Sequence, residues 1–252
     1  MSVGARPPLV APVQMPLVLV PGLMCDASVW EPVVPLLAPH AVCQVVDHGA
    51  ANSLTVMAQQ ALDNAPGRFA LAGHSMGGRV AVEMLRLAPQ RVTHLALLDT
   101  GYRQRAGGAK GDDEARGRYE LLAVARARGV RAMASQWVQG MVAPARLADA
   151  ALVESIVAML ERKSADTFEQ QIEALLKRPD ATPVLAGVRV PALVLCGSED
   201  SWAPVSQHEE IAALMPGRAV LKVVDGAGHM STMEQPELVA LAMLEWLQRP
   251  GL

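Results

Sequence analysis

The sequence predicts an α/β fold in which a mostly parallel sheet is flanked by helices. Short apolar runs alternate along the chain with segments of helical periodicity, which is the pattern of repeated strand–helix units. Three of the six runs are apolar throughout, as expected of strands that are buried on both faces. With 252 residues, 51% of them hydrophobic and 19% charged, the chain can form one large domain with a substantial core.

Six apolar runs are the predicted strands, and five further segments are the predicted helices of the sheet region. The strands are Leu17–Val20, Val42–Val46, Phe69–Ala72, Val92–Leu98, Ala192–Cys196 and Val220–Val224. The helices are Ser28–Leu37, Leu54–Asp63, Met76–Leu87, Ser206–Leu214 and Glu237–Leu247. Strands that are joined through helices in this way run parallel.

One long segment, residues 101–187, breaks the alternation because it contains no convincing strand. Its predicted helices are Glu114–Arg128, Val130–Gln139, Leu147–Glu161 and Thr167–Leu176. The segment has 13 lysines and arginines against 11 aspartates and glutamates, whereas the rest of the chain is net negative. We therefore expect residues 1–100 and 188–252 to form the core and residues 101–187 to form a helical insertion.

Composition argues against several classes of function. The net charge of −3 gives no basic footprint for nucleic acid. The few aromatic residues (four Trp, two Tyr and two Phe) argue against a site built on stacked rings. Three cysteines without CxxC spacing, and the lack of paired histidines, indicate neither a disulfide framework nor a metal site. The first strand is not followed by the G-x-G-x-x-G turn of dinucleotide binding, so no cofactor is expected.

The sequence gives no sign of export or of membrane insertion. Prolines interrupt the apolar stretch near the N-terminus, where a secretory signal would need an unbroken one. No run reaches the roughly 18 apolar residues that a membrane span requires. We expect a cytoplasmic protein that is a monomer or a homodimer.

The strongest motif is Gly73-His74-Ser75-Met76-Gly77-Gly78, between the third predicted strand and the next helix. The pattern G-x-S-x-G at such a junction predicts a sharp, strained turn that presents the serine hydroxyl to solvent. The helix that follows directs its free N–H groups and partial positive charge at the same point, where negative charge develops in acyl transfer. Ser75 is therefore the candidate nucleophile.

A serine hydroxyl needs a base, and two later strands are followed by suitable groups. Asp200 comes just after the strand Ala192–Cys196, and His229 lies in the loop after Val220–Val224. Both residues follow the carboxyl ends of parallel strands, the edge of the sheet that also holds Ser75 and where open α/β sheets bind ligands. A histidine and a carboxylate therefore lie at the edge of the sheet where a base for the hydroxyl of Ser75 is needed.

On these three motifs the chain resembles the α/β-hydrolase family. The matching segments are GHSMGG around Ser75, LVLCGSEDSWAP around Asp200 and GAGHMSTMEQPE around His229, in the order Ser, Asp, His that the family uses. The resemblance implies a catalytic triad in which Ser75 attacks, His229 takes its proton and Asp200 orients His229. It also implies a helical cap at residues 101–187. Members usually have two strands ahead of the first one predicted here, but only sixteen residues precede Leu17, so a shortened N-terminal strand region is expected.

The resemblance also implies an oxyanion hole. In the family it is formed by the N–H of the residue after the nucleophile, here Met76, and by one from the loop after an early strand. That loop matches Val20-Pro21-Gly22-Leu23-Met24, in which Leu23 would supply the second N–H.

The function that the resemblance implies is a serine hydrolase that cleaves a small or medium carboxylic ester or lactone through an acyl-enzyme intermediate. One alternative is a C–C bond hydrolase or thioesterase with the same triad. Another is a ligand-binding protein without catalysis, because a fold does not guarantee turnover.

Several residues compete with these assignments. Asp99 also ends a strand and is the alternative acid to Asp200. His74 is expected to pack beside the turn, and Cys25 to be a buried thiol. Arg79, one helical turn after Ser75, is expected at the surface, with a carboxylate contact as its alternative. The remaining histidines are expected in surface or turn positions; these are His40, His48, His94 and His208.

Overall fold

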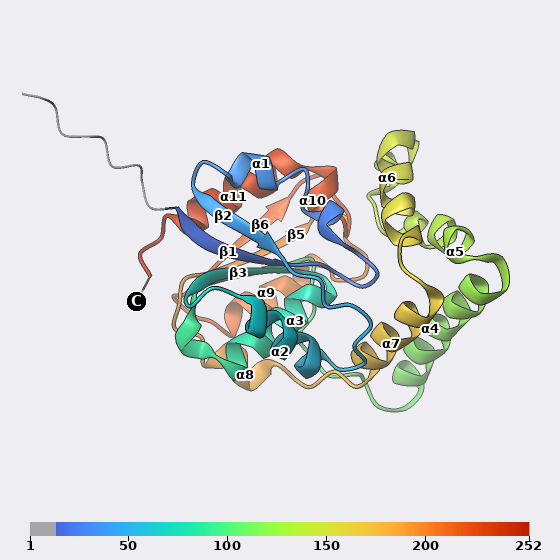
Figure 1. Cartoon of the computed structure of the whole chain (residues 1–252), viewed down its shortest axis with the longest axis horizontal. Helices are drawn as coiled ribbons and strands as arrows, with labels where there is room; N and C mark the ends of the chain where they lie inside the picture. The colour runs from blue at the N-terminus through green and yellow to red at the C-terminus, as the bar shows by residue number, and fades with distance from the viewer. Residues whose placement is uncertain (1–13, 252) are drawn as a thin grey trace, which may run out of the picture.

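The computed structural model describes residues 14–251, which form a six-stranded sheet with helices on both faces (Figure 1). The strands are β1 (Met15–Val20), β2 (Ala41–Val45), β3 (Phe69–His74), β4 (Val92–Leu98), β5 (Ala192–Gly197) and β6 (Ala219–Val224). Their order is β2-β1-β3-β4-β5-β6, and every neighbouring pair is parallel. The predicted α/β fold is confirmed.

The order of the strands places the helices on the two faces. From β1 the chain crosses to β2 on one side, and it then returns to add β3 to β6 on the other side. Because each crossover is right-handed, the helix that leads to β2 and the helices that lead to β3 and the later strands lie on opposite faces of the sheet. Helix α1 (Val34–Leu37) and helix α11 (Pro236–Leu247) pack together on one face (Figure 1). The opposite face carries α2 (Leu54–Asn64), α3 (Met76–Leu87) and α9 (Val205–Ala213). The direction changes between β1 and β3, and such a switch point opens a crevice at the carboxyl ends of the strands.

The core follows the apolar runs of the sequence. Every residue of β3 and β5 is buried, as expected of strands covered on both faces. Strand β6 is different because it is the last strand of the sheet, and Val220 and Val223 are exposed on it. The apolar run at β6 is interrupted by Lys222, and the strand is not buried on both faces.

The chain between β4 and β5 forms helices only. These are α4 (Gly108–Arg128), α5 (Val130–Trp137), α6 (Ala150–Glu161), α7 (Ala165–Leu176) and α8 (Thr182–Ala186), together with two 3₁₀ turns at Val138–Gly140 and Pro144–Ala148. Helices α4 to α7 stand to one side of the sheet, whereas α8 lies below it next to α3 (Figure 1). The helical character predicted for this segment is confirmed, and its division from the core at residues 101 and 187 stays a prediction.

Some predicted boundaries are wrong for local reasons. The helix expected at Ser28–Leu37 is a 3₁₀ turn at Ala27–Val29 followed by the short α1, because Pro32 and Pro35 lack the N–H that a continuous helix requires. Helix α6 begins at Ala150 because the side chain of Asp149 caps it by accepting the N–H of Leu152.

Other differences concern the ends of the chain and very short elements. Strand β1 begins at Met15, two residues before the predicted start, and the strand region expected ahead of it falls on residues 1–13, outside the described part. Helix α8 and helix α10 (Ser231–Glu234) were not predicted, since single turns carry no clear periodicity. No helix within residues 14–251 is both long and apolar enough to cross a membrane.

Two alanine substitutions in helices should have opposite effects on stability. A Cβ at Gly77 would lie 2.1 Å from the carbonyl oxygen of Val20, whereas a Cβ at Gly117 in α4 would meet nothing within 4 Å. Gly77→Ala should therefore lower the free energy of unfolding by about 1–3 kcal/mol, and Gly117→Ala should raise it by up to about 1 kcal/mol. Urea denaturation of both variants measures this; equal effects of the same sign would contradict it.

Candidate active site

Ser75 lies in a sharp turn between β3 and α3 that only glycine neighbours permit. Its backbone has φ 55° and ψ −121°, a conformation that residues with a side chain rarely adopt. A Cβ at Gly73 would lie 2.2 Å from the carbonyl oxygen of Gly77, and one at Gly77 would strike Val20. The two outer glycines of G-x-S-x-G are therefore required by close backbone contacts, and the serine is held at the start of the helix.

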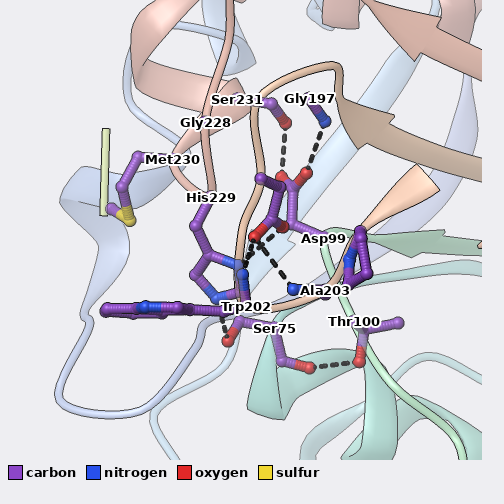
Figure 2. Close-up of polar contacts among 12 residues, drawn as sticks. Ser75, Asp99, Thr100, Gly197, Trp202, Ala203, Gly228, His229, Met230 and Ser231 are labelled. Carbon is purple, nitrogen blue, oxygen red and sulfur yellow. Dashed lines mark hydrogen bonds and ion pairs between the residues drawn. The ribbon is translucent and has the colours of Figure 1, made fainter. Parts of the chain in front are cut away.

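A continuous chain of hydrogen bonds joins the three residues that the motifs single out. Ser75 Oγ lies 2.8 Å from His229 Nε2, and His229 Nδ1 lies 2.8 Å from Asp200 Oδ2 (Figure 2). The other oxygen of Asp200 accepts the backbone N–H groups of Trp202 and Ala203, each at 2.9 Å. Three side chains from distant parts of the sequence thus meet at the carboxyl ends of β3, β5 and β6.

The charges of this chain of hydrogen bonds fix its direction. Burial favours a neutral Asp200, but His229 and the two backbone donors outweigh it and lower the pKa of Asp200 below 3.8. Burial favours a neutral His229, but the Asp200 carboxylate raises the pKa of His229 above 6.5. An ionised Asp200 can only accept, so Nδ1 of His229 donates to it, and Nε2 of the neutral ring is left to accept the proton of Ser75.

Asp99 does not take the place of Asp200. It ends β4 with φ 48°, is fully buried, and accepts hydrogen bonds from Gly197 N–H and Ser231 Oγ (Figure 2). Burial and the nearby charge of Asp200 raise the pKa of Asp99 well above 3.8. No hydrogen bond among the described residues joins it to the ring of His229, so Asp99 anchors the ends of the neighbouring strand and loop.

The histidine next to the serine packs as expected. His74 is buried, and its Nε2 lies 2.8 Å from the carbonyl oxygen of His229, to which it donates. Burial and the neighbouring His229 lower the pKa of His74 to about 4. It is therefore neutral near pH 7 and helps to hold the backbone that carries His229.

The loop after β1 lies directly against the turn at Ser75. A Cβ at Gly22 would be 3.1 Å from both Ser75 Cβ and His74 Nδ1, so a side chain at this position would be crowded by the turn. Leu23 and Met76 line the same cavity as Ser75. Met76 is the first residue of α3, so its N–H has no acceptor within the helix.

A buried glutamine from the inserted helices fixes this loop. Gln171, on α7, accepts the N–H of Met24 at 2.8 Å and donates to the carbonyl oxygen of Gly49 at 2.7 Å. Met24 itself has φ 62°. Gln171 was not predicted, because one of several polar residues on an amphipathic helix carries no local signal of its partners.

The loop that carries His229 is fixed to the inserted helices as well. The buried carboxylate of Glu234 accepts three backbone N–H groups, from Ala143 at 2.8 Å, Gly228 at 2.9 Å and Met230 at 3.1 Å. The N–H of His229 donates to the carbonyl oxygen of Met141 at 2.7 Å. Glu234 was also missed, although it belongs to the MEQPE sequence after His229.

A cavity of about 610 Å³ lies beside Ser75 and is walled by the inserted helices. Three aromatic rings gather there, which corrects the expectation from composition. Trp137 stacks on Trp202 with ring centres 5.7 Å apart and contacts Phe168, while Trp202 lies 5.0 Å from the ring of His229. A small number of aromatic residues did not prevent them from concentrating at one site.

Several single residues also differ from expectation. His48, His94 and His208 are buried and hydrogen-bonded to backbone groups rather than placed at the surface, and His40 is exposed as expected.

Arg79 is half-buried and lines the cavity. Cys25 is buried as predicted, and burial raises the pKa of its thiol to about 12, so it is not a nucleophile at neutral pH. Within residues 14–251 no group of three metal-binding side chains occurs.

Comparisons with known proteins identify relatives of the chain. A sequence profile described as "Alpha/beta hydrolase family" matches residues 17–242. The pimeloyl-[acyl-carrier protein] methyl ester esterase of Photobacterium profundum is 29% identical over 238 residues, which cover 88% of this chain and 90% of that protein. The solved structure of a thermophilic esterase from Thermogutta terrifontis is 26% identical, with a TM-score of 0.82, and the match covers 93% of this chain and 90% of the esterase.

One relative is much longer than this chain. It is the dihydrolipoyllysine-residue acetyltransferase component of the acetoin cleaving system of Pseudomonas putida, 33% identical over 184 residues. These cover 71% of this chain but only 45% of that protein, so the chain spans less than half of its length.

The protonation of His229 should depend on Asp200. In the unaltered protein NMR titration should give His229 a pKa above 6.5, and Asp200→Asn should lower this pKa, since the opposing effect of burial remains. Asp225→Asn, which removes an exposed carboxylate four residues before the histidine, is the matched control and should have little effect. A pKa of His229 that is unchanged by Asp200→Asn would contradict the assignment of the partner.

Proposed function

Since the chain belongs to the alpha/beta hydrolase family, we propose that it is a serine hydrolase that cleaves a small or medium carboxylic ester or lactone through an acyl-enzyme intermediate. The observation that supports this most strongly is the hydrogen-bonded series Ser75, His229 and Asp200 at the base of a cavity. The esterase names of the two full-length relatives are consistent with it.

In the proposed mechanism Ser75 Oγ attacks the carbonyl carbon of the ester. His229 Nε2, 2.8 Å away, takes the hydroxyl proton and later gives it to the leaving alcohol. Asp200 keeps Nδ1–H of His229 oriented and stabilises the imidazolium that forms. Water activated by the same histidine then hydrolyses the acyl-enzyme and restores Ser75.

The negative charge of the tetrahedral intermediate would be held by the backbone N–H groups of Leu23 and Met76. The loop after β1 and the start of α3 meet at Ser75, and the positive end of α3 points to the same place. Donors that are already fixed before the reaction stabilise the developing oxyanion without reorganisation. Gln171 would act as a positioning residue because it holds the peptide that follows Leu23.

We assign residues 101–187 the role of a cap that covers the reactive serine. The cavity is closed on that side by side chains of α4, α5 and α7, and its volume of about 610 Å³ is that of a site for a small molecule. Its walls include the rings of Trp137 and Phe168 and the side chain of Met141, which suit an aliphatic or aromatic ester group.

A C–C bond hydrolase or a thioesterase with the same triad, and a binding protein without turnover, are the competing functions. The relative kcat/KM on a panel of neutral esters, lactones, thioesters and 1,3-diketones distinguishes an esterase or lactonase from a thioesterase and from a C–C bond hydrolase. Tight ligand binding that Ser75→Ala leaves unchanged, together with no turnover on any member of the panel, would instead favour a binding protein.

Ser75 should be both reactive and essential. A fluorophosphonate probe should label the protein at Ser75, and Ser75→Ala and His229→Ala should each lower kcat on the preferred ester by roughly 10⁴-fold or more, because triad members act as a unit. Cys25→Ser, which alters a buried thiol near the site, is the control and should still be labelled. Absence of labelling in the folded protein would refute the proposal.

The two aspartates should differ in their effect on turnover. Asp200→Asn should lower kcat by roughly 10³- to 10⁴-fold, because the amide stabilises neither the required tautomer nor the imidazolium. Asp99→Asn should cost less, since Asp99 supports strand ends. A reversed ranking of the two variants would show that Asp99 is the acid.

With the unaltered protein, kcat/KM should rise with pH through a midpoint above 6.5, because only neutral His229 accepts the proton.

A further inference from the structure

A cluster of three arginines and one glutamate lines the same cavity as Ser75 and His229. Arg79 comes from α3, one turn after Ser75, Arg118 from α4, and Arg178 from the segment just after α7. Glu114, also on α4, lies among them. The side chains of Arg118, Arg178 and Glu114 are only 26%, 10% and 25% exposed, so these charges are largely removed from bulk water.

Two of the arginines are neutralised in part by the single glutamate. Arg178 donates both of its terminal nitrogens to the carboxylate of Glu114, at 2.7 and 2.8 Å, and Arg118 donates Nε and Nη2 to one of its oxygens at 3.1 and 3.0 Å. Burial acts against ionisation, but the two guanidinium groups outweigh it and lower the pKa of Glu114 to about 2. The single carboxylate of Glu114 thus pairs with two guanidinium groups and leaves one positive charge in excess.

Arg79 is left without a carboxylate. Among the described residues its guanidinium makes one hydrogen bond, from Nη1 to the carbonyl oxygen of Arg103 at 2.9 Å, and no ion pair. Nε of Arg178 donates to the same carbonyl at 3.2 Å, so the two guanidinium groups lie side by side. Two further acids line the cavity: Asp113 is exposed and paired with Arg116 at 2.6 Å, and Asp99 accepts hydrogen bonds from Gly197 and Ser231 rather than from Arg79.

The cluster therefore has an excess of positive charge in a place where that is unfavourable. Burial and the neighbouring Arg178 lower the pKa of Arg79 to about 9, which still leaves it protonated at neutral pH. A guanidinium has five donors in a planar fork, and most of those of Arg79 have no protein acceptor among the described residues. A carboxylate or phosphate would accept from this fork in two places and neutralise the excess.

We propose that Arg79, with Arg118 and Arg178 beside it, forms an anion subsite that selects substrates with an ionised carboxylate or phosphate in addition to the ester. The proposal rests on the hydrolase function proposed above and deepens it. The backbone of Arg79 is four residues after Ser75, about 6 Å along the helix axis. Both side chains line one cavity, so we expect a chain of a few carbon atoms between the reacting carbonyl and the anionic group. Apolar side chains of Phe168 and Leu175 line the cavity and would contact that chain.

Kinetics on matched esters tests the subsite. The probes are monomethyl esters of the dicarboxylic acids from succinate to suberate, each compared with the neutral methyl alkanoate of the same chain length. The unaltered protein should prefer the anionic esters, and Arg79→Met should lower the anionic-to-neutral ratio of kcat/KM by roughly 10- to 100-fold, as expected for the loss of a hydrogen bond to a charged group. Arg79→Lys should recover part of the ratio.

Arg128→Met is the matched control, because it removes the same charge from an exposed position at the end of α4 that does not line the cavity. It should leave the anionic-to-neutral ratio unchanged. An equal fall in both variants would mean that only the long-range charge matters and would overturn the subsite, as would an unchanged ratio in Arg79→Met.

A binding measurement separates the subsite from the hydrolase function. Calorimetric titration of Ser75→Ala protein with adipate, with pentyl phosphate and with 1,6-hexanediol should show binding of an anion but not of the diol, and Arg79→Met should weaken it roughly 10- to 100-fold. Tighter binding of adipate identifies a carboxylate substrate, and tighter binding of pentyl phosphate a phosphate one. If adipate or pentyl phosphate binds in an Arg79-dependent way but the unaltered protein is not labelled by the fluorophosphonate, the hydrolase function alone is refuted. If the unaltered protein hydrolyses esters but neither anion binds, the anion subsite alone is refuted.

Discussion

The close contact of backbone with backbone at the start of α3 is the constraint on which the site depends. Gly77 packs so tightly against the end of β1 that no side chain fits between them, and Gly73 packs against Gly77 in the same way. These contacts bring the loop after β1 and the turn after β3 together at the switch point of the sheet. The positive φ of Ser75 follows, since the chain must reverse from strand to helix within one residue.

The buried carboxylates near His229 show how one environment can give two acids different properties. Asp200 is surrounded by donors that stabilise its charge, whereas Asp99 is fully buried and next to that charge. Two negative charges so close together in a medium of low polarity are unfavourable, so ionisation of one disfavours ionisation of the other. Asp200 binds the histidine, whereas Asp99 binds Gly197 and Ser231. This difference between the two carboxyl groups therefore has an electrostatic cause as well as a geometric one.

The sequence predicted those parts of the fold and site that depend on local patterns or on general rules of topology. The strands follow from apolar runs, and the meeting of Ser75, Asp200 and His229 follows from the rule that parallel strands end at one edge. Residues that act through distant partners were not predictable. Gln171 and Glu234 each bind backbone groups far along the chain, and no local spacing reveals such bonds.

The surface roles expected for several residues failed for a related reason. His48 and His94 are buried because their ring nitrogens reach the carbonyl oxygens of Pro21 and Arg249, on other elements.

The rings of Trp137, Phe168 and Trp202 come from three segments, so their assembly depends on how α5, α7 and the loop after β5 pack. Overall composition contains no information on such clustering.

The bonds of the His229 loop to residues 141–143 also limit how the molecule can open. Glu234 binds the N–H of Ala143, and Met141 accepts the N–H of His229, so the turn between α5 and α6 cannot swing outward without disturbing the imidazole. Displacement of α4 would leave these bonds intact, whereas displacement of α7 would break the bond of Gln171 to the loop after β1. With the functions proposed above, a substrate that enters past α4 would pass the charged side chains of Glu114 and Arg118, which line the cavity, on its way to Ser75.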